Sequence, residues 1–129
     1  AVPAAAGIPV THRGLSRGFS VITAHADLGV LPQRRDHTLI LLMGVSRLRD
    51  SVTSLLEAGS DPATPAAIIE RGYHPDQRVT TTELRCLAGV ADRYGVTAPA
   101  VIVIGDVVTL SPYWADRVVE EARPASPAA

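Results

Sequence analysis

The stretch Thr38-Leu39-Ile40-Leu41-Leu42-Met43, which Gly44 follows at once, decides the fold class. It is a continuous apolar run, and a run of this length is typical of a strand that is covered on both faces. Three other segments also have strand character: Phe19–Thr23 alternates apolar and polar residues, and Ala66–Glu70 and Ala100–Ile104 are largely apolar runs. These patterns predict four strands of one sheet.

Helical patterns separate the strands. The first is an apolar stripe that ends before Gly59, a residue type that often caps helix C-termini. The second is predicted to begin from N-cap hydroxyls on Thr80–Thr82 and to end at Gly95. The third is predicted to open at Ser111-Pro112, because proline fits the first turn of a helix. The residues expected to face the core are Leu48, Val52, Leu55 and Leu56 in the first helix, Leu84, Leu87, Ala88, Ala91 and Tyr94 in the second, and Trp114, Val118 and Val119 in the third.

The resulting order is strand, strand, helix, strand, helix, strand, helix. This order predicts an α/β domain, a layered parallel or mixed sheet flanked by helices. The chain has 129 residues and a mass of 13.6 kDa, the size of one domain. We expect the domain to span residues 1–122 and the Pro/Ala/Ser-rich residues 123–129 to be a flexible tail. Residues 26–37, with Arg34 and Arg35, are expected to form a solvated loop.

The composition excludes several classes of function. The formal net charge is −1 at pH 7, so the chain has no basic field for holding nucleic acid. No uncharged apolar run approaches the ~20 residues of a membrane span, and we expect a cytoplasmic protein. All 12 cationic residues are arginine, which excludes chemistry that needs a lysine of this chain. The single cysteine, Cys86, excludes an internal disulfide, and the four histidines lack the spacing of metal ligands.

Three predicted strands end close to a glycine, at Gly44, Gly72 and Gly105. Ligands of α/β sheets bind at the carboxyl ends of strands, and glycine lets a ligand approach the main chain. The pattern indicates either a ligand site at one edge of the sheet, by which we mean a row of strand ends and not an outermost strand, or ordinary strand-to-helix turns. The residues alone leave both interpretations open.

Five collinear blocks of the chain resemble the uroporphyrinogen-III C-methyltransferases. Residues Gly7-Ile8-Pro9-Val10-Thr11-His12-Arg13 are similar to the G-I-P-x-T-H-R signature of these enzymes. Thr23-Ala24-His25 is similar to their T-G-H, with alanine in place of glycine. Residues 38–44, 65–79 and 98–108 resemble three further blocks in the same order.

The resemblance implies the C-terminal lobe of a two-lobe enzyme with the tetrapyrrole methylase fold. Such enzymes methylate uroporphyrinogen III to precorrin-2, on the route to sirohaem and cobalamin. Their methyl donor is S-adenosyl-L-methionine, and S-adenosyl-L-homocysteine is the product. The implied partners are the tetrapyrrole, a missing N-terminal lobe that carries further glycine-rich loops, and a second copy in a homodimer. The isolated lobe is expected to be inactive.

The resemblance also assigns site residues. Met43, which its place in an apolar strand would otherwise assign to the core, would contact the cofactor together with Gly72 and Ala98. Arg13 would bind a substrate carboxylate, since a guanidinium matches a carboxylate at two points, and His12 would be its hydrogen-bonding neighbour. The resemblance assigns no catalytic residue to this chain.

Two alternative functions remain open from the sequence. One is a non-enzymatic module that binds a tetrapyrrole or a nucleoside, because the first lobe is missing from the chain. The other is a related methylase that acts on a later precorrin. The Gly7–Arg13 signature argues against the second, since it most resembles the uroporphyrinogen enzymes.

Overall fold

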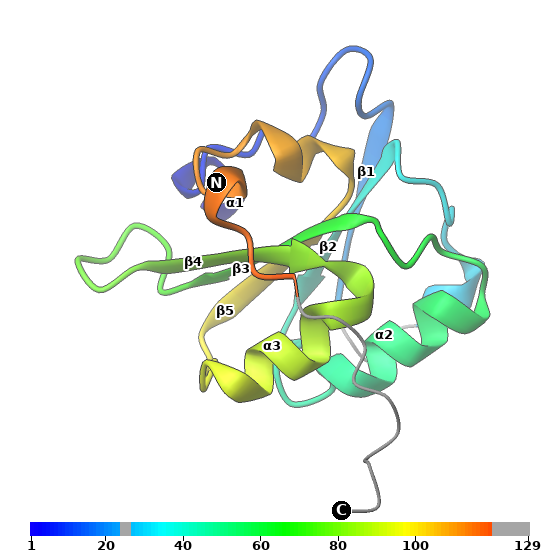
Figure 1. The fold of residues 1–129 in the computed structure, drawn as a ribbon. Helices are drawn as coiled ribbons and strands as arrows, with labels where there is room; N and C mark the ends of the chain where they lie inside the picture. The colour runs from blue at the N-terminus through cyan, green and yellow to red at the C-terminus, as the bar shows by residue number, and fades with distance from the viewer. Residues whose placement is uncertain (24–26, 120–129) are drawn as a thin grey trace, which may run out of the picture.

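A computed structural model describes residues 1–23 and 27–119, and its centre is one five-stranded sheet (Figure 1). The strand order is β1-β2-β5-β3-β4. β1 and β2 pair in parallel, and the other three neighbouring pairs are antiparallel, so the expected mixed α/β sheet is confirmed. The strands are β1 (Gly18–Thr23), β2 (His37–Leu42), β3 (Pro65–Glu70), β4 (Arg78–Glu83) and β5 (Ala100–Ile104).

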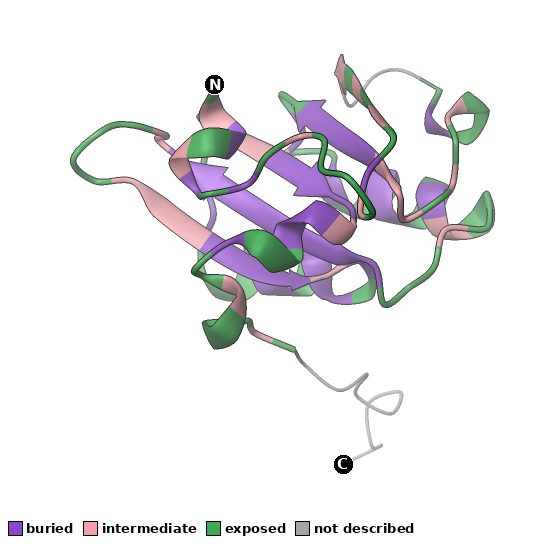
Figure 2. Ribbon diagram, turned by 90° about the horizontal axis from the view of Figure 1, so that it is seen from above, coloured by how far each residue is buried: buried purple, intermediate pink, exposed green. Residues whose placement is uncertain are grey.

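Helices and turns cover both faces of this sheet (Figure 1). α2 (Leu48–Glu57) and α3 (Leu87–Arg93) pack on one face over the larger apolar core. α1 (Val2–Ala5) and the 3-10 turn Asp106–Leu110 belong to a smaller core on the other face. Every residue of β3 is buried between these two layers, and Figure 2 shows the strands as the buried centre of the molecule.

Most of the predicted helix faces are confirmed. Leu48, Val52 and Leu55 of α2 are buried, and Leu56 packs partly buried against the same core. Of the second stripe, Leu84, Leu87, Ala88 and Ala91 are buried, although Leu84 lies in a 3-10 turn before α3. The assignment of Tyr94 to the core is wrong, because its side chain is 39% exposed at the end of α3.

The assignment of Thr80–Thr82 to a helix N-terminus is wrong, because these residues lie in the middle of β4. Threonine is branched at Cβ and therefore also favours strands. In the strand, the Thr81 hydroxyl donates to the carbonyl oxygen of Tyr113, and the Thr82 hydroxyl donates to that of Val118. The segment has no apolar alternation, so the sequence pattern did not indicate a strand here.

The third predicted helix is also wrong, because the segment after Ser111 forms only the 3-10 turn Trp114–Asp116. The Val118 amide donates to Thr81 in β4, so its backbone pairs with the sheet instead of continuing a helix. Trp114 and Val118 are partly buried, and Val119 is 41% exposed. The predicted tail and its boundary at residue 122 lie outside the described residues. Of the block Thr23-Ala24-His25, the structure describes only Thr23.

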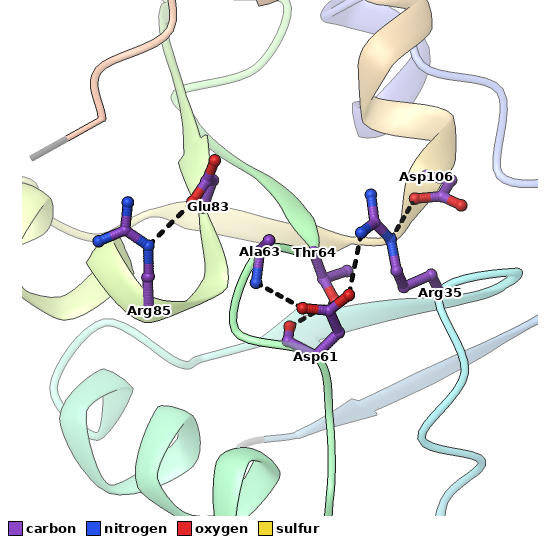
Figure 3. Close-up of polar contacts among 7 residues, drawn as sticks. All are labelled: Arg35, Asp61, Ala63, Thr64, Glu83, Arg85 and Asp106. Carbon is purple, nitrogen blue, oxygen red and sulfur yellow. Dashed lines mark hydrogen bonds and ion pairs between the residues drawn. The ribbon is translucent and has the colours of Figure 1, made fainter.

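Arg35 is not merely solvated, because it links three segments at one edge of the sheet (Figure 3). Its guanidinium donates to Asp106 through Nε at 2.8 Å and to Asp61 through Nη1 at 3.0 Å. Its carbonyl oxygen also accepts the Asp106 amide. The part of the predicted loop that the structure describes is therefore fixed in place where β2 begins. Among the residues that the structure describes, no helix is long and apolar enough to cross a membrane.

Candidate ligand site

The sheet topology brings the ends of β2 and β3 to one edge. β5 lies between them and is antiparallel to both, so its first residues lie at that same edge. Leu42 pairs with Val101, and Glu70 pairs with Ala100. Met43 directly follows Leu42, and Gly72 and Ala98 are each separated by one residue from Glu70 and Ala100, respectively. The structure thus collects all three predicted cofactor residues at a single sheet edge.

Gly105, by contrast, lies at the opposite edge from Gly44 and Gly72. The expectation that all three glycines mark one edge is therefore wrong for Gly105. The reason is the direction of β5, whose carboxyl end points away from those of β2 and β3. Gly105 instead sits against the start of β2, where an added Cβ would lie 3.3 Å from the Cα of Thr38.

A cleft of about 600 Å³ opens at the edge that carries Met43. We call it the edge cleft. Its walls are mostly apolar, and Ser46 and Thr97 add hydroxyl groups. A smaller hollow of about 240 Å³ adjoins it around Gly72, and the two share Pro99 and Ala100. The edge cleft is lined by Met43, Val45 and Ser46 from one segment and by residues 96–100 from the other.

The backbone at this edge adopts unusual conformations. Met43, Arg71 and Tyr73 have φ values of 54°, 50° and 66°, and they are all of the described non-glycine residues with positive φ. This left-handed region is uncommon for side chains other than those of asparagine and aspartate. Such conformations persist where the surrounding structure enforces them, and they are frequent at ligand sites. The assignment of Met43 to the core is wrong, because its side chain is 67% exposed at the cleft.

Gly72 is in close contact with α1. A Cβ at this position would lie 2.8 Å from Cγ1 of Val2, so any larger residue displaces the N-terminal segment. The Tyr73 hydroxyl donates to the carbonyl oxygen of Ala1 at 2.7 Å. Gln77 connects the same two segments. Its side-chain oxygen accepts from the Tyr73 amide, and its side-chain nitrogen donates to the carbonyl oxygen of Ala5. The loop after β3 and the start of the chain therefore form one surface.

Glu70 is a buried carboxylate at this edge that the sequence analysis did not single out. It ends β3, and its side chain is only 1% exposed. It accepts hydrogen bonds from Arg78 Nε at 2.6 Å, from the Thr97 amide at 3.2 Å and from Arg71 Nη1 at 3.4 Å. The available signal was its chemistry, since an ionisable residue inside an apolar strand is rarely buried without a partner.

Opposing effects act on the pKa of Glu70. Burial raises the pKa, while the hydrogen bonds from Arg78 and Thr97 and the charges of Arg78 and Arg71 lower it. The net direction is below the ordinary value, so Glu70 is ionised at neutral pH. The same pairing raises the pKa of Arg78.

Arg13 and His12 lie away from the edge cleft. They belong to an exposed loop closed by a bridge between His12 and Ser16, just before β1. Because β1 is parallel to β2, this loop is at the opposite edge from Met43, a strand length or ~20 Å away. His12 Nδ1 is 3.0 Å from the carbonyl oxygen of Arg13. Among the described residues, Arg13 makes no ion pair, and its substrate role stays a prediction.

The described residues offer no cluster of histidine, cysteine and acidic side chains that could hold a metal ion. Cys86 is buried beside α3 and lies outside the edge cleft. The chemistry available at the cleft is therefore apolar contact, a few hydroxyl and backbone groups, and the buried carboxylate behind them.

Comparisons with known proteins agree with this geometry. A model of the Tetrapyrrole (Corrin/Porphyrin) Methylases matches residues 1–88. The S-adenosyl-L-methionine-dependent uroporphyrinogen III methyltransferase of Methanosarcina barkeri is 42% identical over 85% of this chain and 46% of its own length. The siroheme synthase of Saccharophagus degradans is 41% identical over 79% of this chain and 24% of its own length. The chain thus spans less than half the length of these relatives.

Solved structures have the same fold. The uroporphyrin-III C-methyl transferase of Thermus thermophilus complexed with S-adenyl homocysteine has 35% identity and a TM-score of 0.65. The similarity covers 81% of this chain and 46% of that one. A cobalt precorrin-4 methyltransferase has a TM-score of 0.71 over 83% of this chain and 48% of that one. Its identity is 19%, so this second likeness shows the fold alone.

The contact between Gly72 and Val2 can be tested by a double-mutant cycle. We expect Gly72→Ala to lower the free energy of unfolding by about 1 kcal/mol, because the new methyl group overlaps Val2. Adding Val2→Ala should recover most of this loss, since it removes the overlapping atom. Urea denaturation followed by circular dichroism measures both effects.

Gly89→Ala is the matched control for this cycle. Gly89 lies in α3 and has no atom within 4 Å of an added Cβ. Alanine there should stabilise the chain by up to about 1 kcal/mol. Additive effects of Gly72→Ala and Val2→Ala would show that the two residues are not in contact.

The lowered pKa of Glu70 predicts how stability depends on pH. A group whose folded pKa lies below its ordinary value, here 4.5, stabilises the fold fully above that value. The contribution is lost as the pH falls through the folded pKa. We expect Glu70→Gln to cost about 2 kcal/mol at neutral pH and to flatten the acid side of the stability curve. Urea denaturation at a series of pH values measures this difference.

Asp36 and Asp61 also have lowered pKa values, Asp36 because of Arg34 and Asp61 because of the Ala63 amide and Arg35, and both proteins in this comparison retain them. The difference between the two curves therefore isolates Glu70. Parallel curves for the wild type and Glu70→Gln would mean that Glu70 has the same pKa in the folded and unfolded chains.

Proposed function

Because the chain belongs to the tetrapyrrole (corrin/porphyrin) methylase family, we propose that it forms one lobe of an S-adenosyl-L-methionine-dependent methyltransferase acting on uroporphyrinogen III. The observation that carries this proposal is that Met43 and Ala98 line the edge cleft and Gly72 lines the hollow that adjoins it. The relative from Thermus thermophilus that was solved with S-adenyl homocysteine supports it, at 35% identity. A later precorrin as substrate is less favoured, because the likeness to the precorrin-4 enzyme is one of fold only.

The edge cleft has the chemistry that a nucleoside ligand needs. Pockets for such ligands combine apolar walls with a few placed polar groups. Met43, Val96 and Ala98 supply apolar surface, and Thr97 and Ser46 supply hydroxyl groups. The thioether of Met43 is polarisable and suits contact with an aromatic base. We propose that Met43 and Ala98 hold the adenosyl part of the cofactor and that Gly72 lets the main chain approach it.

The contribution of this lobe is binding and orientation. The bound cofactor supplies an electrophilic methyl group. Methyl transfer needs the acceptor carbon and this methyl group in line, and fixing such an alignment lowers the barrier to reaction. The apolar walls exclude water from the same space. We assign no catalytic residue to this chain.

We further propose that a complementary lobe covers the open apolar face beside the cleft. Phe19 and Val21 of β1 are each 49% exposed on this face. They line a hollow of about 360 Å³ together with Leu42 and the first three residues of the chain. Relatives of about twice the length have enough chain for a second lobe. A homodimer and a cytoplasmic location remain predictions for the whole protein.

Met43→Asp tests the cofactor site. The substitution should weaken binding of S-adenosyl-L-homocysteine about tenfold, because it puts a carboxylate in an apolar wall. Aspartate tolerates the left-handed conformation of this position, so the backbone should not change. S-adenosyl-L-homocysteine is the right probe because it has no sulfonium charge to attract the new carboxylate. Calorimetry on the whole protein, taken as the reading frame that contains this chain, gives the affinity.

Leu110→Asp is the control for this experiment. Leu110 is 40% exposed and follows β5 at the opposite edge of the sheet, so its change adds the same charge away from the cleft. It should leave the affinity unchanged. Equal affinity in Met43→Asp and the wild type would remove Met43 from the site. If the wild type binds the cofactor but transfers no methyl group to uroporphyrinogen III, the proposed substrate is wrong, and the alternatives are a binding module or a methylase of a later precorrin.

Arg13→Ala tests the proposed contact with a substrate carboxylate. We expect the KM for the tetrapyrrole to rise about tenfold, since a charge-assisted pair is lost. The KM for S-adenosyl-L-methionine should stay constant, because Arg13 lies a strand length from Met43. Steady-state kinetics of the whole protein separates the two constants. An equal rise in both would argue against a carboxylate contact.

A further inference from the structure

Glu70 is the most deeply buried charged group at the edge cleft, and the proposed function does not yet use it. It is absent from the lining of the cleft and lies behind it, at the end of β3. Its three hydrogen-bond partners come from three different segments. Arg78 opens β4, Arg71 begins the loop after β3, and Thr97 lies between α3 and β5.

The contact with Thr97 acts on a wall of the cleft. Thr97, Ala98 and Pro99 are exposed, and all three line the edge cleft. The Thr97 amide donates to Glu70 Oε2 at 3.2 Å, so the carboxylate holds this segment by its backbone. The neighbouring Val96 is anchored separately, through its buried side chain and through the hydrogen bond that its backbone amide donates to the carbonyl oxygen of Ala91.

The contact with Arg71 acts on the adjoining hollow around Gly72. Nε of Arg71 forms an ion pair with Asp76 at 2.8 Å, and the backbone amide of Arg71 donates to the carbonyl oxygen of Pro99 at 3.0 Å. Arg71 therefore connects the loop that contains Gly72 to the segment that contains Ala98. Its guanidinium lies 3.4 Å from the same oxygen of Glu70 that accepts from Thr97. One carboxylate thus joins the segments that carry Gly72 and Ala98, two of the three predicted cofactor residues.

We propose that Glu70 is a positioning residue for the cofactor: its carboxylate sets the backbone of residues 96–99 against the loop at Gly72. A charge in a fully buried strand is expensive, and an apolar residue would serve packing as well. What a carboxylate adds is two acceptor oxygens, which take donors from three segments at once. This proposal rests on the proposed function, because it concerns the same cleft.

Glu70→Gln is the sharpest test, since the shape is preserved. A carboxamide has one acceptor oxygen, and its NH₂ group is a donor. If the oxygen faces Arg78, the NH₂ group faces the Thr97 amide, and two donors oppose each other. We expect the Kd for S-adenosyl-L-homocysteine and the KM for S-adenosyl-L-methionine to rise about tenfold, with kcat within about twofold of wild type. Amide hydrogen exchange of residues 96–98 should become faster.

Two further variants separate positioning from general stability. Glu70→Asp keeps the charge but withdraws it by one methylene, so it should restore part of the affinity. Asp106→Asn disrupts a comparable carboxylate–arginine pair at the opposite edge. It should leave both the affinity and the amide exchange of residues 96–98 unchanged, even if it lowers the melting temperature. Calorimetry and kinetics use the whole protein, and exchange is also measured on this chain.

The possible results are distinct. Unchanged affinity and exchange in Glu70→Gln, with a wild type that binds, would overturn the positioning role and leave the proposed function intact. A wild type that does not bind S-adenosyl-L-homocysteine would overturn the proposed function. The amide exchange of residues 96–98 would then still decide whether Glu70 holds this segment. If Glu70→Gln does not fold, the graded loss in Glu70→Asp decides, and wild-type affinity there would refute the proposal.

Discussion

The position of β5 between β2 and β3 is the constraint on which the site depends. Each of its neighbours runs opposite to it, so ten or so backbone hydrogen bonds fix where β2 and β3 end relative to where β5 begins. That register places Met43, Ala98 and Gly72 in a row along one edge. A shift by one residue would turn the buried side chains of β5 to the wrong face. Cores on both faces oppose such a shift, because Ile102 and Val103 belong to different cores.

The two edges of the sheet are held by different kinds of polar contact. At the edge away from the cleft, Arg35 bridges Asp61 and Asp106 in partly exposed positions (Figure 3). Such pairs are solvated and contribute little each. At the cleft edge, Glu70 is buried and accepts hydrogen bonds from the adjoining loops. A buried carboxylate fixes geometry more strictly, because losing any one of its partners leaves a desolvated charge. Strict geometry is what three left-handed residues at this edge require.

The elements that could be predicted are those whose pattern has one interpretation. The apolar runs of β2, β3 and β5 and the stripe of α2 bury most of the residues that their pattern indicated, although Leu42 at the end of β2 is 36% exposed. Thr80–Thr82 were predicted to cap a helix, but threonine also favours strands, and in the structure their strand contacts Tyr113 and Val118. The direction of β5 is not encoded in its own residues. It is decided by which neighbours the whole sheet provides, and this is why Gly105 was expected at the wrong edge.

The candidate site, like the fold, could be predicted from the sequence only in part. Resemblance indicated Met43, Gly72 and Ala98, and the sheet brings them together, but neither spacing nor composition could place Arg13 relative to them. Glu70 was overlooked because it was treated as the end of a strand, although a charge inside an apolar run needs buried partners. Its partners Arg78 and Thr97 are 8 and 27 residues away in sequence. Contacts at such separations become visible only when the fold is known.

The exposure of Met43 and of the β1 face has a physical consequence for how such a cleft works. A wall that is open on one side leaves much of a ligand in water, so its apolar contacts contribute only part of their full value. A second lobe that closes on the ligand buries these surfaces together with it. Part of the resulting free energy offsets the cost of ordering the lobes, and the remainder appears as affinity. The more rigid this half is beforehand, the smaller that cost. A backbone fixed by a buried carboxylate therefore favours closure even though the carboxylate lies behind the cleft wall.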